Sequence, residues 1–402
     1  MEVFSYVILL LSSAIFFGNI ANRLKQPAIV GEIIGGIIVG PFLAYILSHF
    51  LPLGHYMFDF LSVVYASPKT KDIMSFAGIM LMFGAGLETD LKELLKVGKP
   101  ALLVAIFGVV TPFVLGYIVG ISFLGLSSLG AMYIGVALSI TAVALSVTTL
   151  IQMNKLNTKE GLTIVGAAIV DDIIGVILLS ILMAMKEGAS ISFTNIATTT
   201  VLALLFVIFS VFLSPKICSV LFKFARKVKS QDHLALILLW IFVYSVIAHF
   251  LNIHLIIGAY LGGLSIREVL RPGEKEVLEN WIWGFFAPLF FAWTGFSVVF
   301  SRNAIGFALF IIVLAAFSGK VFGGGLGAYI SGFSIKSSIE IGIGMNGRAA
   351  VELIVANIAL TSGLINRNIY STLVFMAVIM ALSTPILLKW YIKRFSSSQK
   401  GT

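Results

Sequence analysis

Long apolar stretches separated by short polar segments run along the whole chain. They are mostly about 20 residues long and lack the alternation of half-buried strands, so they predict membrane-spanning helices. The stretch around 58–64 is too short to cross. About thirteen spans are predicted, at residues 3–22, 28–48, 72–90, 99–123, 128–152, 160–186, 193–225, 233–251, 254–270, 278–300, 303–331, 337–361 and 369–394.

The composition supports an all-α integral membrane protein. Hydrophobic residues make up 59% of the chain and charged residues 11%, a ratio that no soluble surface of this size tolerates. The single cysteine, Cys218, excludes a disulfide framework and a cysteine-based metal site. The net charge of +9 does not indicate nucleic acid, because basic residues gather in the cytoplasmic loops of membrane proteins.

The distribution of the 27 basic residues predicts the orientation of the chain. About 19 of them follow odd-numbered spans or lie at the C-terminus, and about five lie on the opposite side. The positive-inside rule therefore places the N-terminus outside the cell membrane and the C-terminus in the cytoplasm.

An odd number of spans suggests an internal symmetry. Thirteen divides into six, one and six, so that the second half enters the membrane inverted, as in many secondary transporters. The span 193–225 would be the linker, with an interruption near Ser214–Pro215. We expect one transmembrane domain over residues 1–395 and a short cytoplasmic tail, 396–402, with no soluble regulatory domain.

The most informative polar feature is a pair of adjacent aspartates in the middle of the span 160–186. Asp171 and Asp172 point about 100° apart on a helix, so they can serve two partners, one a permeant ion and the other a fixed cation. Carboxylates in hydrocarbon are costly and indicate a proton or cation site. The alternative is a neutralised pair at a helix contact.

Lys320 lies near the middle of the span 303–331, among glycines that allow close helix packing. It is too deep to extend easily to the interface, so its natural partner is one of the two aspartates. Burial opposes the charged form of a carboxylate and a nearby lysine favours it, so the balance can let an aspartate hold either a proton or a metal cation. A static ion pair without a transport role is the alternative.

Two spans are predicted to be broken near their centres. The span 128–152 is dense in small and hydroxyl residues around Ser139 and Thr141, and 337–361 carries Gly344, Asn346 and Gly347 at a similar depth. Glycine tolerates non-helical angles, and hydroxyl groups can satisfy freed backbone groups. These spans are the fifth of each half, so they would cross at the midplane and expose carbonyls that suit a small cation.

The remaining deep charges have mainly structural interpretations. Arg348 and Glu352 are four residues apart, so they can neutralise each other on one helix face, with a place in the ion pathway as the alternative. Glu32 and Glu88 lie near the cytoplasmic ends of their spans. Lys216 is also near a cytoplasmic end and is expected to extend to the interface.

Several motifs resemble those of monovalent cation:proton antiporters, in the Kef/NapA-like sodium–proton branch. The stretch from Gln26 to Pro41 is close to that branch's QP-x-V-x-GE-I-x-x-G-x-x-x-GP signature. Met82 to Leu91 and the paired aspartates follow, and the resemblance covers essentially the whole chain.

This resemblance implies roles for particular residues. Asp172 is similar to the family's ion- and proton-binding carboxylate, Asp171 to the partner of the conserved lysine, here Lys320, and Thr141 to the threonine of the broken helix. It implies a homodimer in membrane lipid that works as an elevator. The dimerisation part would be about 1–98 and 226–300, the transport core about 99–190 and 301–395, and the linker about 191–225.

The resemblance also has a departure. Many relatives have Arg-Gly-Glu in the twelfth span, whereas this chain has Arg348-Ala349-Ala350-Val351-Glu352, so the glutamate is either displaced by two residues or a different group. The paired aspartates, in place of Asn-Asp, imply electrogenic exchange with more protons than sodium ions moved. The expected role is pH homeostasis without a cofactor.

The sequence therefore predicts an Na⁺ or Li⁺/H⁺ antiporter in which Asp172 binds a proton or a cation in alternation. A K⁺/H⁺ exchanger on the same fold is the nearest alternative, followed by a sodium-coupled symporter for an organic solute. An intramembrane enzyme is disfavoured. A prenyltransferase-type site needs a third aspartate where Gly175 stands, and an aspartyl protease needs its two aspartates on separate helices.

Overall fold

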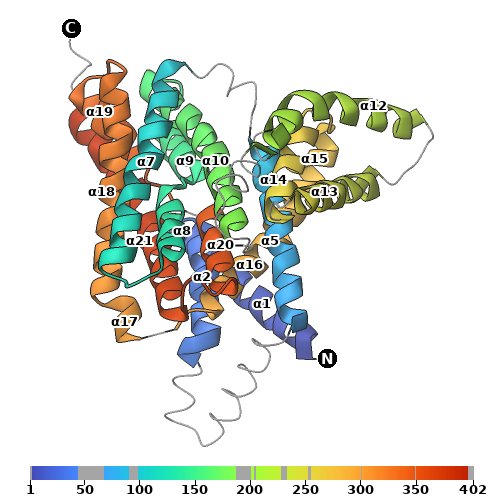
Figure 1. The fold of residues 1–402 in the computed structure, drawn as a ribbon, viewed down its shortest axis with the longest axis horizontal. Coiled ribbons are helices and arrows are strands. Elements are labelled where there is room, and N and C mark those ends of the chain that lie inside the picture. The colour runs from blue at the N-terminus through green and yellow to red at the C-terminus, as the bar shows by residue number, and fades with distance from the viewer. Residues whose placement is uncertain are drawn as a thin grey trace, which may run out of the picture. The chain divides into compact units, whose positions relative to one another are not determined.

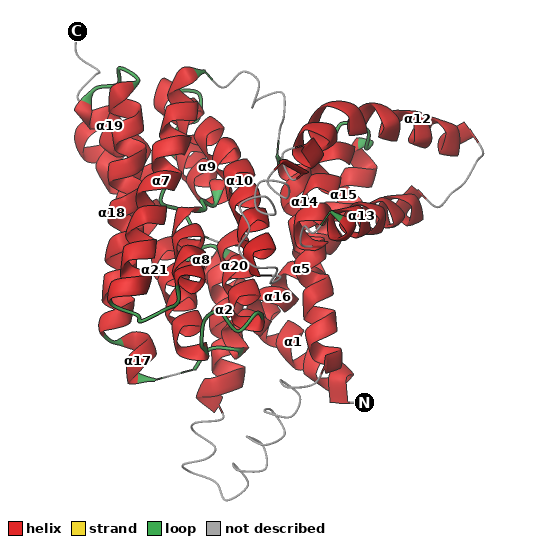
Figure 2. Ribbon diagram, viewed as in Figure 1, coloured by secondary structure: helices red, strands yellow, loops and turns green. Residues whose placement is uncertain are grey.

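The computed structural model describes residues 2–43, 68–89, 98–186, 201–202, 205–227, 233–251, 255–299, 301–348 and 350–396. Within these ranges every regular element is a helix and no strand is present (Figures 1 and 2). The all-helical class predicted from the sequence is confirmed.

The length and composition of the helices fit a protein that crosses the membrane several times. In the described parts of the chain, six helices are long and apolar enough to span a bilayer: Phe4–Arg23, Lys99–Ser122, Lys159–Met183, Leu205–Phe224, Asn303–Ile330 and Arg367–Phe395. Shorter apolar helices of 10–17 residues accompany them. Parts of several predicted spans, including 193–225, lie outside the described residues, so the count of thirteen stays a prediction.

The chain folds into two compact units. The first comprises Met1–Ala66, Glu93–Gly175 and Phe291–Thr402. Its helices are α1 (Glu2–Arg23), α2 (Ala28–Ile37), η1 (Ile38–Phe42), α7 (Lys99–Ser122), α8 (Ser128–Ser139), α9 (Val143–Gln152), α17 (Arg302–Ile305), α18 (Phe307–Ile330), α19 (Ile335–Gly344), α20 (Ala350–Thr361), α21 (Arg367–Tyr391) and η4 (Ile392–Ser396).

The second unit comprises Ser67–Lys92 and Val176–Phe290. Its helices are α5 (Pro68–Glu88), η2 (Phe209–Leu213), α12 (Ser214–Lys227), α13 (His233–Phe250), α14 (Leu255–Ile266), α15 (Pro272–Trp281) and η3 (Ile282–Phe286). Helices α10 (Lys159–Lys186) and α16 (Ala287–Phe296) contribute to both units. The break expected near Ser214–Pro215 is absent, because the backbone at Ser214 is helical and α12 continues through Pro215, directly after the π-helical turn η2.

Glycine-rich contacts bring α18 close to α7 in the first unit. Gly319, Gly323 and Gly327 recur every four residues along one face of α18. A Cβ atom on Gly323 would lie 2.3 Å from the carbonyl oxygen of Phe107 in α7, so the two backbones are in direct contact. This contact fixes the height and rotation of α18, and hence the position of Lys320.

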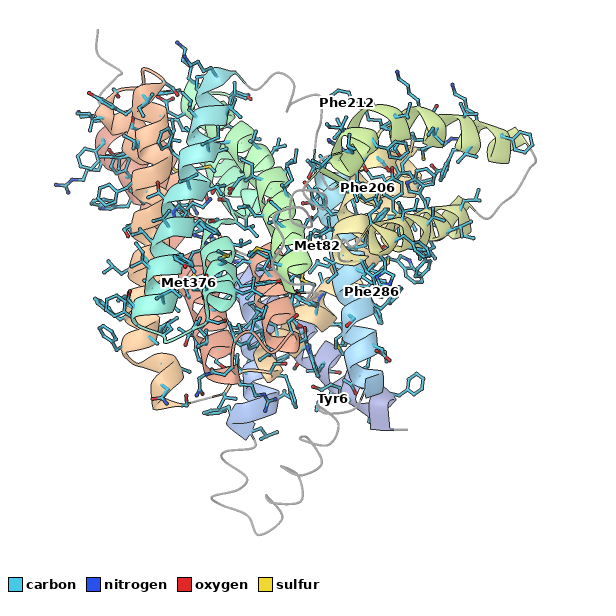
Figure 3. All side chains as sticks on the ribbon, in the orientation of Figure 1. Tyr6, Met82, Phe206, Phe212, Phe286 and Met376 are labelled. Atoms are coloured by element: carbon cyan, nitrogen blue, oxygen red, sulfur yellow. The ribbon has the colours of Figure 1, made fainter. Side chains whose placement is uncertain are left out.

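Many large apolar side chains point outward, as lipid contact requires. Phe206 is 4% exposed, whereas Phe212, on the same helical segment, is 58% exposed (Figure 3). Phe4 and Phe322 are more exposed still. Such side chains are unfavourable in water but favourable in the hydrocarbon of a bilayer.

Candidate functional site

Two helix pairs in the first unit are interrupted where the sequence predicted breaks. Helix α8 ends at Ser139, and α9 begins at Val143 after three residues that are not helical. Helix α19 ends at Gly344, and α20 begins at Ala350. The Ser139 hydroxyl donates to the carbonyl oxygen of Val109 at 3.0 Å, which anchors the end of α8 to α7.

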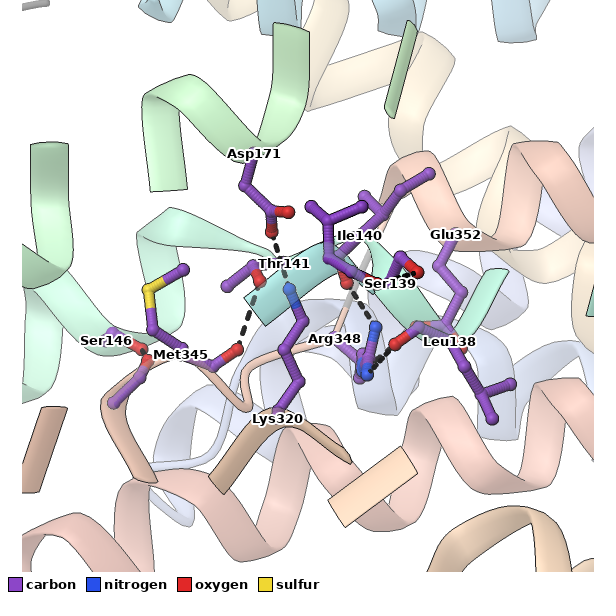
Figure 4. Close-up of polar contacts among 12 residues, drawn as sticks. Leu138, Ser139, Ile140, Thr141, Ser146, Asp171, Lys320, Met345, Arg348 and Glu352 are labelled. Carbon is purple, nitrogen blue, oxygen red and sulfur yellow. Dashed lines mark hydrogen bonds and ion pairs between the residues drawn. The ribbon is translucent and has the colours of Figure 1, made fainter. Parts of the chain in front are cut away.

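The two interruptions contact each other directly, although they are about 200 residues apart in sequence. Three of the hydrogen bonds between them are donated from the first break or the start of α9 to carbonyl oxygens at the second break (Figure 4). The hydrogen bonds run from Thr141 Oγ1 to the oxygen of Met345 at 3.0 Å, from Ala142 N to the oxygen of Gly347 at 2.7 Å, and from Ser146 Oγ to the oxygen of Gly344. The breaks therefore form one cross-linked centre.

A buried ion pair lies beside this centre. The ammonium of Lys320 in α18 lies 2.8 Å from Asp171 Oδ2 in α10, and both side chains are completely buried (Figure 4). Thr141 lies next to this pair in Figure 4. Asp172, the next residue along α10, is partly exposed, as expected for a side chain that leaves the helix in a different direction.

Arg348 is fully buried and donates to the carboxyl end of α8. Its guanidinium bonds the carbonyl oxygens of Ala137, at 3.3 Å, and of Leu138 and Ile140. The last carbonyls of a helix have no partner within the helix and carry partial negative charge. Arg348 satisfies them and supplies a positive charge at the end where it is favourable.

The prediction that Arg348 and Glu352 share one helix face is wrong in its geometry. Arg348 lies in the break, before α20 begins, because the chain unwinds after Gly344. The pair still forms, with 3.9 Å between Arg348 Nε and a Glu352 carboxylate oxygen. Glu352 is 1% exposed, and within the described ranges neither of its carboxylate oxygens has a hydrogen-bond partner.

The other predicted charges lie elsewhere. Glu32 is buried in α2, where a Cβ on Gly18 would lie 3.2 Å from its Cγ. Glu88 is the last residue of α5 in the second unit and is exposed. Lys216 is exposed, and its extension to the interface stays a prediction. These residues are not among those whose hydrogen bonds join the two breaks.

The structure adds residues that the sequence did not single out. Ser146 ties α9 to Gly344, and the backbone oxygen of Met345 receives the hydroxyl of Thr141. Thr384 in α21 is 2% exposed, and its hydroxyl has no hydrogen-bond partner. The available signal was a hydroxyl residue directly before a proline, Pro385, in an otherwise apolar helix.

Broken helices in contact beside buried carboxylates and a lysine are the arrangement of a secondary transporter. The sequence matches the transmembrane sodium/hydrogen exchanger family over residues 8–394, and the chain belongs to this family of transporters. It is 34% identical over 392 residues to the probable Na⁺/H⁺ antiporter GerT of Bacillus cereus, an alignment that covers 96% of this chain and 98% of the relative.

Two further relatives are similar over nearly their whole length. The chain is 32% identical to the Na⁺/H⁺-K⁺ antiporter GerN of Bacillus cereus, covering 97% of this chain and 96% of GerN. It is 31% identical to the Na⁺/H⁺ antiporter of Enterococcus hirae, with 98% and 99% covered. The fold is similar to that of the sodium proton antiporter MjNhaP1 from Methanocaldococcus jannaschii, with a TM-score of 0.63, 16% identity and 99% of each chain covered.

Proposed function

We propose that this protein exchanges Na⁺ or Li⁺ for H⁺ across the cell membrane, with Asp172 binding either the cation or the proton. The observation that carries the proposal is the pair of aspartates beside the two cross-linked breaks, with Asp171 already held by Lys320 at 2.8 Å. Membership in the sodium/hydrogen exchanger family and the names of the relatives support the same activity.

In the proposed mechanism the two carboxylates have different roles. Asp171 is compensated by Lys320, so it contributes little net charge to the site. Asp172 is partly exposed and is the carboxylate that alternates between a proton and a cation. A single group that binds one species at a time, exposed to each side in turn, is sufficient for exchange. Cation entry would compete with the pairing of Asp171 and Lys320.

A K⁺/H⁺ exchange activity is the second candidate. One relative, GerN, is named an Na⁺/H⁺-K⁺ antiporter, and it is 32% identical to this chain. Carboxylate, hydroxyl and carbonyl oxygens bind both cations, so the choice depends on the size of the cavity and the number of ligands.

The proposal also covers the membrane topology, the oligomeric state and the transport cycle. The protein would have thirteen spans in an inverted six-one-six repeat, with the N-terminus outside. A homodimer would hold the dimerisation part, about 1–98 and 226–300, while the core, about 99–190 and 301–395, moves as an elevator. Exchange would be electrogenic and would serve pH homeostasis.

Proton flux in proteoliposomes tests the activity. A pH-sensitive dye inside vesicles that contain the purified protein reports proton movement as Na⁺, Li⁺ or K⁺ is added in turn. We expect Na⁺ and Li⁺ to drive flux and Asp172→Asn to abolish it while the protein stays folded. Asp72→Asn, at an exposed position in α5, is the matched control and should leave the flux unchanged.

The outcomes separate the candidates. A response to K⁺ alone would move the protein to K⁺/H⁺ exchange, and Na⁺-driven flux in Asp172→Asn would refute the role of this residue. No response from folded wild-type protein to any of the three cations would overturn the antiporter proposal. Electrogenic exchange predicts that clamping the membrane potential at zero accelerates flux, whereas electroneutral exchange would not respond.

A further inference from the structure

The side chain of Asn346 is buried without any hydrogen bond. The residue is 0% exposed, and neither Oδ1 nor Nδ2 has a hydrogen-bond partner among the residues that the structure describes. Its backbone N–H donates to the oxygen of Ile343 at 3.1 Å. Buried amide groups almost always have hydrogen-bond partners. A buried side-chain amide whose oxygen and nitrogen are both unpaired therefore indicates a ligand that is not part of the chain.

Asn346 lies at the centre of the cross-linked breaks. The carbonyl oxygen of the residue before it, Met345, accepts the Thr141 hydroxyl, and that of the residue after it, Gly347, accepts the Ala142 N–H. Both peptide neighbours are therefore held by the first break. The unpaired amide is confined to the point where the two broken helices meet.

Helix α21 contributes a second unpaired group. Thr384 is 2% exposed, and its hydroxyl has no hydrogen-bond partner in the described part of the chain. One turn later, Leu388 belongs to the same hydrophobic cluster as Met345. One turn earlier, Ala381 clusters with Val30, and Ala142 packs against that pair. Thr384 therefore lies between Ala381 and Leu388 on one face of α21, and the clusters of these two residues each include a residue at one of the breaks.

Pro385 adds a backbone oxygen to this face. Proline has no N–H, so it cannot donate to the carbonyl of Ala381 four residues earlier in α21. Three uncharged oxygens can thus act as cation ligands: the amide oxygen of Asn346, the hydroxyl oxygen of Thr384 and the carbonyl oxygen of Ala381. Alkali cations bind such oxygens, and each one replaces part of the hydration shell without adding charge.

We propose that the side-chain oxygen of Asn346, assisted by Thr384 on the facing helix, is a neutral ligand for the transported alkali cation. This inference rests on the proposed function, because it concerns the cation that Asp172 would bind. A neutral ligand affects cation affinity but does not bind the competing proton. Asn346 therefore sets how tightly the site holds Na⁺ relative to H⁺.

Substitutions at Asn346 test the role of its amide. Asn346→Leu has a similar volume without polar atoms, and Asn346→Ser is smaller and too short to reach the same point. Both are expected to raise KM for Na⁺ by about tenfold. The Na⁺ concentration needed for a given thermal stabilisation of the purified protein should rise by the same factor. Asn357→Leu, on α20 and only partly buried, is the control with an unchanged KM.

Thr384 and Thr372 offer a matched pair on one helix. The Thr372 hydroxyl donates to the carbonyl oxygens of Ala304, at 3.0 Å, and Asn368, at 2.9 Å, whereas that of Thr384 is unpaired. Thr384→Val should raise KM for Na⁺ by a few fold without lowering the melting temperature. Thr372→Val should lower the melting temperature without changing KM.

The results decide between this inference and the activity itself. Wild-type flux together with a wild-type KM in both Asn346→Leu and Asn346→Ser would overturn the ligand role and leave the antiporter proposal standing. If the leucine variant does not fold, the serine variant alone decides. A wild-type protein that neither transports nor is stabilised by any alkali cation would overturn both proposals together.

Discussion

The guanidinium of Arg348 lies 3.3 Å from the carbonyl oxygen of Ala137 and also bonds two further carbonyls at the end of α8. A helix that ends inside a membrane leaves partial negative charge there, with no water to screen it. Arg348 compensates this charge with a fixed cation from the second break. The end of α8 is therefore already neutralised by a cation that belongs to the protein itself.

Replacing Arg348 by lysine tests this capping. Lysine keeps the charge but cannot bond three carbonyls in one plane as the guanidinium does. We expect Arg348→Lys to lower the free energy of unfolding by about 1.5–3 kcal/mol, the cost of charge-assisted hydrogen bonds that are lost. Thermal unfolding in detergent measures the loss. Arg394→Lys, at an exposed cation–π contact with Trp390, should change little, and an equal loss in both variants would argue against capping.

The sequence predicted the components of this centre better than their connections. Lys320 was expected to pair with one of the two aspartates because each charge is costly alone in hydrocarbon, the family resemblance implied Asp171, and the pair with Asp171 is present. The breaks were expected where glycine and hydroxyl residues gather, and both are present. These inferences depend on local composition and on the energetics of burial.

The partner of Arg348 could not be predicted in the same way. A spacing of four suggested an ion pair along one helix. The pair is present, but the chain unwinds before α20, and the guanidinium also bonds carbonyls about 210 residues away in sequence. The unpaired amide of Asn346 had no sequence signal beyond its place among glycines. Such contacts depend on how the two breaks pack, which only the tertiary structure specifies.

A double-mutant cycle measures the coupling between Asp171 and Lys320. Asp171→Asn or Lys320→Gln alone leaves one buried charge uncompensated and should lower the free energy of unfolding by about 3–5 kcal/mol. The double variant removes both charges, so it should be much more stable than the sum of the single effects predicts. Additive losses would show that the two side chains do not stabilise each other.

Two adjacent glycines in α18 provide a steric test of the contact that positions Lys320. A Cβ on Gly323 would lie 2.3 Å from the oxygen of Phe107, whereas a Cβ on Gly324 would meet its nearest atoms at 3.5 Å, an ordinary contact. Gly323→Ala should lower stability by about 1–3 kcal/mol and reduce flux, because α18 must move away from α7. Gly324→Ala should have little effect on either, and equal effects would contradict the steric argument.

Thr141 links the two breaks, so its hydroxyl should affect both stability and transport. Thr141→Val keeps the shape but leaves the oxygen of Met345 without its donor, at a cost of about 1–3 kcal/mol. We expect a lower melting temperature and weaker Na⁺-driven flux. Thr141→Ser keeps the hydroxyl and should retain most of both. If valine and serine behaved alike, the hydrogen bond to Met345 would have no role.

Competition at Asp172 predicts how pH affects Na⁺ affinity. A proton and a cation that exclude each other make KM for Na⁺ rise as pH falls, because more of the carboxylate is protonated and closed to the cation. In the acidic limit the rise approaches about tenfold per pH unit for one competing proton. Initial rates in proteoliposomes, with equal pH on both sides and Na⁺ varied at each pH, measure this slope. Asp72→Asn should keep the wild-type slope. A KM for Na⁺ that stays constant while the maximal rate changes would mean that protons and cations bind at separate sites, which the single-carboxylate mechanism does not allow.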